Sequence, residues 1–190
     1  MSTRARIATV CQVKNIQSSL EDNREYMMGI LDLALRQKPD LVCLPETFTK
    51  PDSDTQPASA FAEPVPGPTV DAVSRRAKRQ GCYIICPLLT KRDGDCWNSA
   101  VVIDRSGDIL GIYDKLQPVT SSSDYTVFEK GVRPATGNPV FDLDFGRVGI
   151  QICFDIGFPE GWAKLSEQGA KVVFWPSAYN GGFPLRIYAY

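Results

Sequence analysis

The pattern of hydrophobic and polar positions divides the chain into short apolar runs and longer segments of helical period. Continuous or alternating apolar runs predict strands, whereas apolar residues that recur every three or four positions predict amphipathic helices. The runs that predict strands are residues 6–13, 40–46, 83–92, 97–104, 108–115, 140–153 and 171–176. The segments that predict helices are residues 18–38, 69–80 and 159–168. Because helices and strands alternate, the pattern indicates an α/β fold with a mixed sheet or sheets.

Turn and cap residues mark where these elements begin and end. Ser18 and Glu21 have the spacing of a capping box, which predicts the start of the first helix. The pairs at 93–94 and 106–107, Asp-Gly and Ser-Gly, indicate two successive hairpins, and a third is expected to turn near Gly146. No internal repeat or change of composition divides the chain, so residues 1–190 are interpreted as a single domain.

Composition and charge exclude several classes of protein. With 190 residues, 43% hydrophobic and 23% charged, the chain resembles an ordinary globular domain with a sizeable core. A formal net charge of −1 provides no basic field to hold nucleic acid or anionic lipid. No apolar run approaches the roughly 20 residues needed to cross a bilayer, and the apolar part of the N-terminus is too short for a signal peptide. These features predict a cytoplasmic protein without a nucleic-acid or membrane partner.

The cysteine and histidine counts limit the chemistry. Six cysteines lie mostly inside apolar runs, which is typical of reduced core residues rather than a disulfide framework. The chain has no histidine, so it lacks both the commonest general base and the commonest metal ligand. Any catalysis must therefore use carboxylate, lysine, cysteine or hydroxyl groups.

Three polar residues come directly after apolar strands. Glu46 follows "LVCLP", Lys115 follows "ILGIYD" and Cys153 ends "VGIQIC". Reactive groups in open α/β sheets collect where strands end, so these three are expected to converge. Each residue also has an ordinary structural interpretation: Glu46 as a loop carboxylate, Lys115 as a solvated lysine and Cys153 as an inert buried thiol.

The alternation of side chains along the predicted strand indicates the direction in which the Cys153 side chain points. Val148, Ile150 and Ile152 share one face of the predicted strand, while the residues between them share the other, smaller and more polar face with Cys153. Cys153 is therefore expected to point away from the most apolar residues.

These groups could together attack a carbonyl or nitrile carbon. A thiol with its ordinary pKa of about 8.5 is mostly protonated at neutral pH, so it needs a base, and without histidine that base is a carboxylate such as Glu46. Lys115 and the backbone N–H of Phe154 could stabilise the negative charge that develops on the attacked group. The protonated glutamic acid could then protonate a leaving amine and afterwards activate water against the thioester.

Three segments, "LVCLPETF", "GIYDKLQP" and "VGIQICFDIGFPE", resemble in this order the signature segments of the nitrilase superfamily, the carbon–nitrogen hydrolases, and "FWPSAY" supports the likeness. The resemblance implies an α-β-β-α sandwich, a homodimer or larger homo-oligomer, and hydrolysis of a non-peptide C–N bond through a Glu–Lys–Cys triad and a covalent acyl-enzyme. It assigns Glu46 as base, Lys115 as oxyanion lysine and Cys153 as nucleophile, with no metal or organic cofactor.

Further site residues follow from the same resemblance. Many members carry a second glutamate between the lysine and the cysteine; Glu129 has the right chemical type, and Asp124 is the alternative. Phe154, Tyr179 and Asn180 are expected to contact substrate, although aromatic packing is the competing explanation after a strand.

The resemblance also sets the expected activity. The segment around "CFDIGFPE" is more similar to amidases and N-carbamoyl amidohydrolases than to true nitrilases, so the expected substrate is a small amide or N-carbamoyl compound, with ammonia or an amine released. Family members continue through further strands and a helix, so we expect residues 1–190 to be an incomplete domain that is poorly soluble or inactive alone. The alternatives are a non-catalytic module acting in assembly, a nitrilase acting on nitriles and, last, an acyltransferase.

Overall fold

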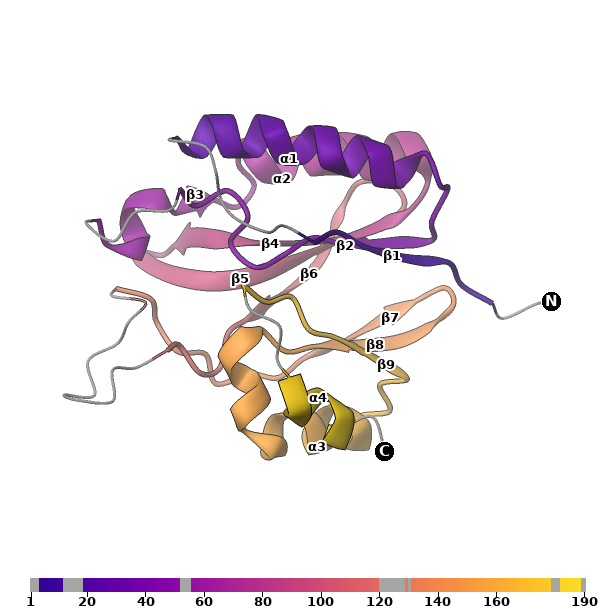
Figure 1. Cartoon of the computed structure of the whole chain (residues 1–190), viewed down its shortest axis with the longest axis vertical. Coiled ribbons are helices and arrows are strands. Elements are labelled where there is room, and N and C mark those ends of the chain that lie inside the picture. Colours follow the sequence, from indigo (N-terminus) through magenta and orange to yellow (C-terminus); the bar gives the residue numbers. More distant parts are fainter. Residues whose placement is uncertain are drawn as a thin grey trace.

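The computed structural model describes residues 4–11, 19–51, 56–119, 129, 131–178 and 182–188. Within these residues two β-sheets face each other, and helices cover the outer side of each sheet (Figure 1). The arrangement is the expected α-β-β-α sandwich. Of the helices in this described part of the chain, none combines the length and apolar character needed to cross a membrane.

The first sheet has six strands among the described residues, in the order β1-β2-β4-β5-β6, with β3 paired to β4. Its strands are β1 (Ile7–Thr9), β2 (Leu41–Cys43), β3 (Glu63–Pro64), β4 (Tyr83–Arg92), β5 (Asp95–Ile103) and β6 (Ile109–Asp114). β1, β2 and β4 are parallel, whereas β4, β5 and β6 form two antiparallel hairpins. Both hairpins were expected from their turn residues, and Gly94 and Gly107 adopt the positive φ that such turns require.

Helices α1 (Leu20–Leu35) and α2 (Pro68–Gln80) cover the outer face of this sheet (Figure 1). A short 3-10 helix, η1 (Ala58–Phe61), precedes α2. The core between helices and sheet includes Met27, Leu31, Leu35, Val73, Ala77, Ile84, Leu88 and Val101. The capping prediction is wrong by one residue, because Ser19 is the N-cap of α1 and its side chain accepts the N–H of Asp22 at 3.1 Å. Ser18 lies outside the described residues.

The second sheet, again among the described residues, has the order β7-β8-β9. Its strands are β7 (Val140–Leu143), β8 (Gly146–Ile150) and β9 (Val172–Phe174), and its helical elements are η2 (Cys153–Gly157), α3 (Pro159–Glu167) and α4 (Gly182–Tyr188). The core between the two sheets includes Ile85, Ala100, Val102, Tyr113, Phe141, Val148, Ile150 and Phe174. On the other face of β8, a Cβ at Gly149 would lie 2.8 Å from Leu165, so glycine allows α3 to pack closely there.

The hairpin expected over 140–153 is present, but its second strand is shorter than predicted. β8 ends at Ile150, and Cys153 begins the 3-10 helix η2 with a φ of +46°. The alternation of a strand therefore does not extend to Cys153, and this residue belongs to the same apolar cluster as Val148 and Ile152. The expectation that Cys153 points away from them is wrong.

Candidate active site

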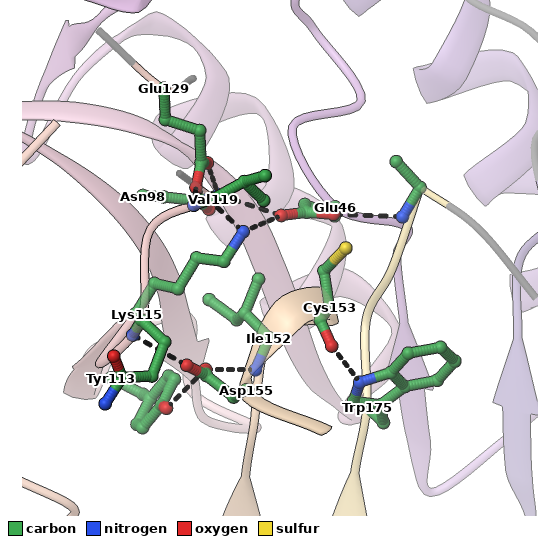
Figure 2. Close-up of polar contacts among 12 residues, drawn as sticks. Glu46, Asn98, Tyr113, Lys115, Val119, Glu129, Ile152, Cys153, Asp155 and Trp175 are labelled. Carbon is green, nitrogen blue, oxygen red and sulfur yellow. Dashed lines mark hydrogen bonds and ion pairs between the residues drawn. The ribbon is translucent and has the colours of Figure 1, made fainter. Parts of the chain in front are cut away.

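Chain segments that follow β2, β6 and β8 bring Glu46, Lys115 and Cys153 together (Figure 2). The ammonium Nζ of Lys115 lies 2.8 Å from Glu46 Oε1 and 2.9 Å from Glu129 Oε2. The thiol of Cys153 lies beside the Glu46 carboxylate, whose negative charge acts on the pKa of the thiol (Figure 2). The four residues that the sequence places in a catalytic group thus form one contiguous cluster.

Lys115 is a buried charge with two carboxylate partners. Its side chain is 1% exposed, which excludes the interpretation as a solvated lysine at a strand end. Burial alone would lower the pKa of Lys115, but the negative charges of Glu46 and Glu129 outweigh burial and hold the pKa above its ordinary value. The ammonium group is therefore charged at neutral pH.

Glu46 is held at both carboxylate oxygens. Oε1 accepts hydrogen bonds from Lys115 Nζ at 2.8 Å and from Asn98 Nδ2 at 2.9 Å. Oε2 accepts the backbone N–H of Ala178 at 2.9 Å, from the segment that follows β9. The residue is 7% exposed, so it is not an ordinary loop carboxylate. These contacts fix the carboxylate beside the thiol of Cys153.

Glu129 lies on the opposite side of Lys115 from Glu46 (Figure 2). Its Oε2 accepts the backbone N–H of Val119 at 2.9 Å in addition to the lysine, and its Oε1 accepts Asn98 Nδ2 at 2.6 Å. Glu129 therefore contacts the lysine directly, and its role as the second acidic residue stays a prediction. The alternative, Asp124, lies outside the described residues.

Asn98 is the site residue that the sequence reasoning missed. It lies on β5 and is fully buried, and its backbone carbonyl accepts the N–H of Lys115 at 2.8 Å. The β5–β6 pairing places residue 98 directly opposite residue 115, because Ser99 pairs with Asp114. A polar residue inside the apolar run "WNSAVVID", across the hairpin from the lysine, was the available signal.

The backbone at Cys153 is held by the segment after β9. The N–H of Cys153 donates to the carbonyl of Pro176 at 3.0 Å, and the indole N–H of Trp175 donates to the carbonyl of Cys153 at 2.9 Å (Figure 2). A positive φ is uncommon for a residue with a side chain, and such backbone strain concentrates at functional sites. The turn directs the thiol toward Glu46 and away from the direction that a continued strand would give it.

Burial and the neighbouring charges determine the protonation of the thiol. Burial first, and then the negative charge of Glu46, raise the pKa of Cys153 to about 12, although Lys115 acts in the opposite direction. The thiol is therefore protonated at neutral pH when no substrate is bound. It can become a nucleophile only if a base takes its proton, and Glu46 is the carboxylate that lies beside it (Figure 2).

A buried carboxylate, Asp155, connects the turn of Cys153 with the segment of Lys115. Asp155 Oδ2 accepts the N–H of Ile152 at 2.8 Å and the hydroxyl of Tyr113 at 2.7 Å, and Oδ1 accepts the N–H of Gln117 at 2.8 Å. Burial raises the pKa of Asp155 to about 6 even though these three donors act to lower it. Because β6 and η2 belong to different layers, this carboxylate ties the two halves of the site together.

Removing the hydroxyl of Tyr113 tests this connection. We expect Tyr113→Phe to lower the free energy of unfolding by about 1 to 2 kcal/mol, since buried Asp155 loses one donor without gaining a replacement. Urea denaturation of both proteins measures the difference. Tyr83→Phe is the matched control, because its hydroxyl accepts one long bond of 3.3 Å from Asp144 and its loss should cost less. Equal stability of Tyr113→Phe and the parent would contradict the assignment.

The predicted substrate contacts have mixed outcomes. Tyr179 and Asn180 lie outside the described residues. The ring of Phe154 packs edge-to-face on Phe158, with 5.7 Å between ring centroids. The backbone N–H of Phe154 is the second in η2, and the first N–H groups of a helical turn lack acceptors within that turn. Phe154 as a substrate contact therefore remains a prediction that rests on its N–H and not on its ring.

The cluster combines a thiol, a carboxylate that can accept its proton, and a buried cation. This combination suits attack on a carbonyl carbon, since the cation can stabilise the negative charge that forms on oxygen. Within the described ranges, no three His, Cys, Asp or Glu side chains are grouped so that they could hold a metal ion.

Comparison with known proteins gives the same family as the sequence segments. The family model described as carbon-nitrogen hydrolase matches residues 7–186. A beta-ureidopropionase of Arabidopsis thaliana is 33% identical over 166 residues, which are 83% of this chain and 40% of that protein. A deaminated glutathione amidase of Synechocystis is 31% identical over 171 residues, 85% of this chain and 62% of that protein. The chain thus spans about half the length of such relatives.

A solved structure supports the fold. An amidase variant from Nesterenkonia sp. AN1, in which acrylamide has added to the active-site cysteine, matches with a TM-score of 0.80 at 19% identity. The match covers 98% of this chain and 74% of that one. With the family model covering nearly all of the described residues, the chain belongs to the carbon–nitrogen hydrolase family.

Proposed function

We propose that the protein hydrolyses the C–N bond of a small amide or N-carbamoyl compound through a thioester on Cys153. The observation that carries this proposal is the buried ion pair of Lys115 and Glu46 at 2.8 Å, with the Cys153 thiol beside it (Figure 2). Desolvating a lysine and two carboxylates is costly, and such groups concentrate at sites that use their charge. A reaction that develops negative charge next to Lys115 makes use of the buried ammonium, and this use explains why the cost of desolvation is tolerated.

The first half of the reaction forms the acyl-enzyme. Glu46 takes the thiol proton while Sγ of Cys153 forms a bond to the carbonyl carbon of the substrate. The electron pair of the carbonyl moves onto oxygen, where Lys115 Nζ and the N–H of Phe154 stabilise it. The tetrahedral intermediate then collapses, the C–N bond breaks, and protonated Glu46 gives its proton to the departing nitrogen. Ammonia or an amine leaves, and a thioester remains.

The second half restores the thiol. Glu46, again ionised, takes a proton from a water molecule whose oxygen attacks the thioester carbon. The resulting oxyanion occupies the same place beside Lys115, and the C–S bond breaks with return of the proton to sulfur. The product is a carboxylic acid, or a carbamic acid where the substrate is an N-carbamoyl compound. No cofactor takes part in this scheme.

The names of the relatives support amide or ureido substrates. A beta-ureidopropionase and a deaminated glutathione amidase each align with more than four-fifths of this chain. A nitrile is the alternative substrate, since the same thiol can add to a nitrile carbon. A non-catalytic module acting in assembly is the other alternative, but assembly alone would not require a buried ammonium between two carboxylates.

Release of ammonia tests the proposal. The product of the complete reading frame that encodes this chain is incubated with a panel of amides, N-carbamoyl amino acids and nitriles, and ammonia or amine is measured. We expect turnover of at least one amide or N-carbamoyl compound, and its loss in Cys153→Ala. Cys82→Ala is the matched control, because Cys82 is also a buried thiol in the core and its loss should leave turnover in place. Turnover that survives in Cys153→Ala would overturn the mechanism.

We further propose that the protein is a cytoplasmic homodimer or larger homo-oligomer whose only partner class is its small-molecule substrate, without nucleic acid or membrane. All six cysteines lie in the described residues as free thiols, which suits a reducing compartment. The formal net charge of −1 does not favour a polyanion. Exposed apolar side chains at Phe158, Val172 and Ile187 would be covered by another surface in an assembly. Light scattering of the purified protein measures the oligomeric state.

A further inference from the structure

Asn98 contacts both carboxylates of the site through one amide group. Its Nδ2 donates to Glu46 Oε1 at 2.9 Å and to Glu129 Oε1 at 2.6 Å (Figure 2). An amide nitrogen has two hydrogens, so its donor capacity is fully used on these two residues. Asn98 is also fully buried, and its strand pairs with the segment that ends at Lys115. Its position is therefore set by the first sheet and not by a surface loop.

The acceptor sites of Glu46 show what this contact does. A carboxylate oxygen has about two lone-pair positions. Among the residues that the structure describes, Lys115 and Asn98 occupy both positions of Glu46 Oε1, whereas the N–H of Ala178 is the single donor to Oε2. The remaining acceptor position of the carboxylate is thus on Oε2. The proton of Cys153 is expected to transfer to Oε2, because Oε1 has no further place for a donor.

Charge balance gives a second reason for an amide at this position. The groups that face Asn98 and its two partners are Glu46 after β2, Lys115 after β6, Glu129, and Cys153 at the start of η2. Two carboxylates share one ammonium, so the cluster carries a formal excess of negative charge. A donor that hydrogen-bonds to an ionised carboxylate favours its charged form. An asparagine supplies two such bonds without adding a second cation that would compete for the base.

We propose that Asn98 is a positioning residue, which stabilises the charged form of both carboxylates and reserves Oε2 of Glu46 for the proton of Cys153. It acts through Glu46 and Glu129 and does not itself need to touch the reacting atoms. This inference rests on the proposed function for its kinetic consequence. Its structural part, the effect on carboxylate ionisation, holds for the folded protein with or without substrate.

The kinetic experiment replaces Asn98 with leucine, which has a similar volume and no donor. We expect the acid limb of the kcat/KM profile to move up by about one pH unit in Asn98→Leu. At a pH below that limb the rate falls about tenfold and recovers as the pH is raised, while KM changes by less than about twofold. A purely structural role would instead lower the rate by one factor at every pH. An unmoved acid limb in Asn98→Leu would overturn the proposal.

Ser99→Ala is the matched control for this strand. Ser99 is also fully buried on β5, but its hydroxyl donates to Asp114 at 2.6 Å, away from the two glutamates. Its removal should lower stability and leave the acid limb in place. If Ser99→Ala moved the limb as far as Asn98→Leu does, the effect would belong to the strand and the proposal would be wrong.

A titration that needs no turnover separates this inference from the proposed function. Carbon-13 NMR follows the glutamate carboxyl signals with pH, and the signals of the site are assigned by their disappearance in Glu46→Gln and Glu129→Gln. In Asn98→Leu, or in Asn98→Ala if leucine does not fold, we expect the midpoint of this coupled pair to rise by about one pH unit relative to the parent. Unchanged midpoints would refute the role of Asn98 even in an active enzyme. Shifted midpoints in a protein without turnover would support it while the proposed function fails.

Discussion

Replacing Glu46 with glutamine is expected to lower kcat by about 10³-fold while the protein stays folded. General acid–base groups contribute roughly 10² to 10⁴ to rate, and Glu46 is asked to act in both halves of the reaction. Glutamine keeps the size of the side chain and leaves Lys115 paired with Glu129 at 2.9 Å, so no buried charge is left without a partner. The loss should therefore appear in turnover and hardly in stability.

Steady-state kinetics together with thermal unfolding of Glu46→Gln measures both quantities. Glu63→Gln is a suitable control, since Glu63 is another buried carboxylate, held by Thr69 of α2 and Arg24 of α1. That variant should lose stability and keep its kcat. A Glu46→Gln protein with the kcat of the parent would remove Glu46 from the role of base.

Replacing Lys115 with methionine is expected to lower turnover by at least about 10²- to 10³-fold and to destabilise the protein by about 3 to 5 kcal/mol. This is the usual cost of removing one partner from a buried ion pair. Methionine fills a similar volume, but it leaves Glu46 and Glu129 without the cation that both contact. The oxyanion also loses its main stabilising charge, and the loss of such a donor costs about 10² to 10³ in rate.

The double variant Lys115→Met/Glu129→Gln distinguishes the two effects. Removing one of the two unpaired carboxylates should recover part of the stability measured by urea denaturation, while turnover stays as low as in Lys115→Met. Arg76→Met is the control, because Arg76 pairs with half-exposed Asp32 and should cost about 1 kcal/mol or less. If Lys115→Met were as stable as the parent, the buried charge cluster would not exist as described.

The positions of Glu46, Lys115 and Cys153 followed from the sequence because each comes directly after an apolar strand. Apolar period and turn residues were enough to place β2, β6 and β8 along the chain, although β2 and β8 are shorter than predicted, and strand ends converge in a sandwich of this kind. The hairpin turns at 93–94 and 106–107 were also predicted from the sequence, since few residues accept the positive φ that such turns require.

Other features of the site depend on contacts that local patterns do not encode. Asn98 lies inside an apolar strand, and its role appears only when the register places it opposite Lys115. Cys153 has a positive φ, which a cysteine in the sequence does not indicate. The turn is held by hydrogen bonds with Pro176 and Trp175 from a later segment. Asp155 likewise joins two layers through partners distant in sequence. Such features depend on tertiary contacts, which override local preference.

The most direct test of the account is the mass of the acyl-enzyme. The product of the complete reading frame is mixed with an amide or N-carbamoyl compound that it hydrolyses, quenched in acid within the first turnovers, and examined by intact-protein mass spectrometry and peptide mapping. We expect an added mass equal to the acyl group, located on Cys153, removed by hydroxylamine, and absent in Cys153→Ala. An adduct on any other residue, or one that persists in Cys153→Ala, would contradict it.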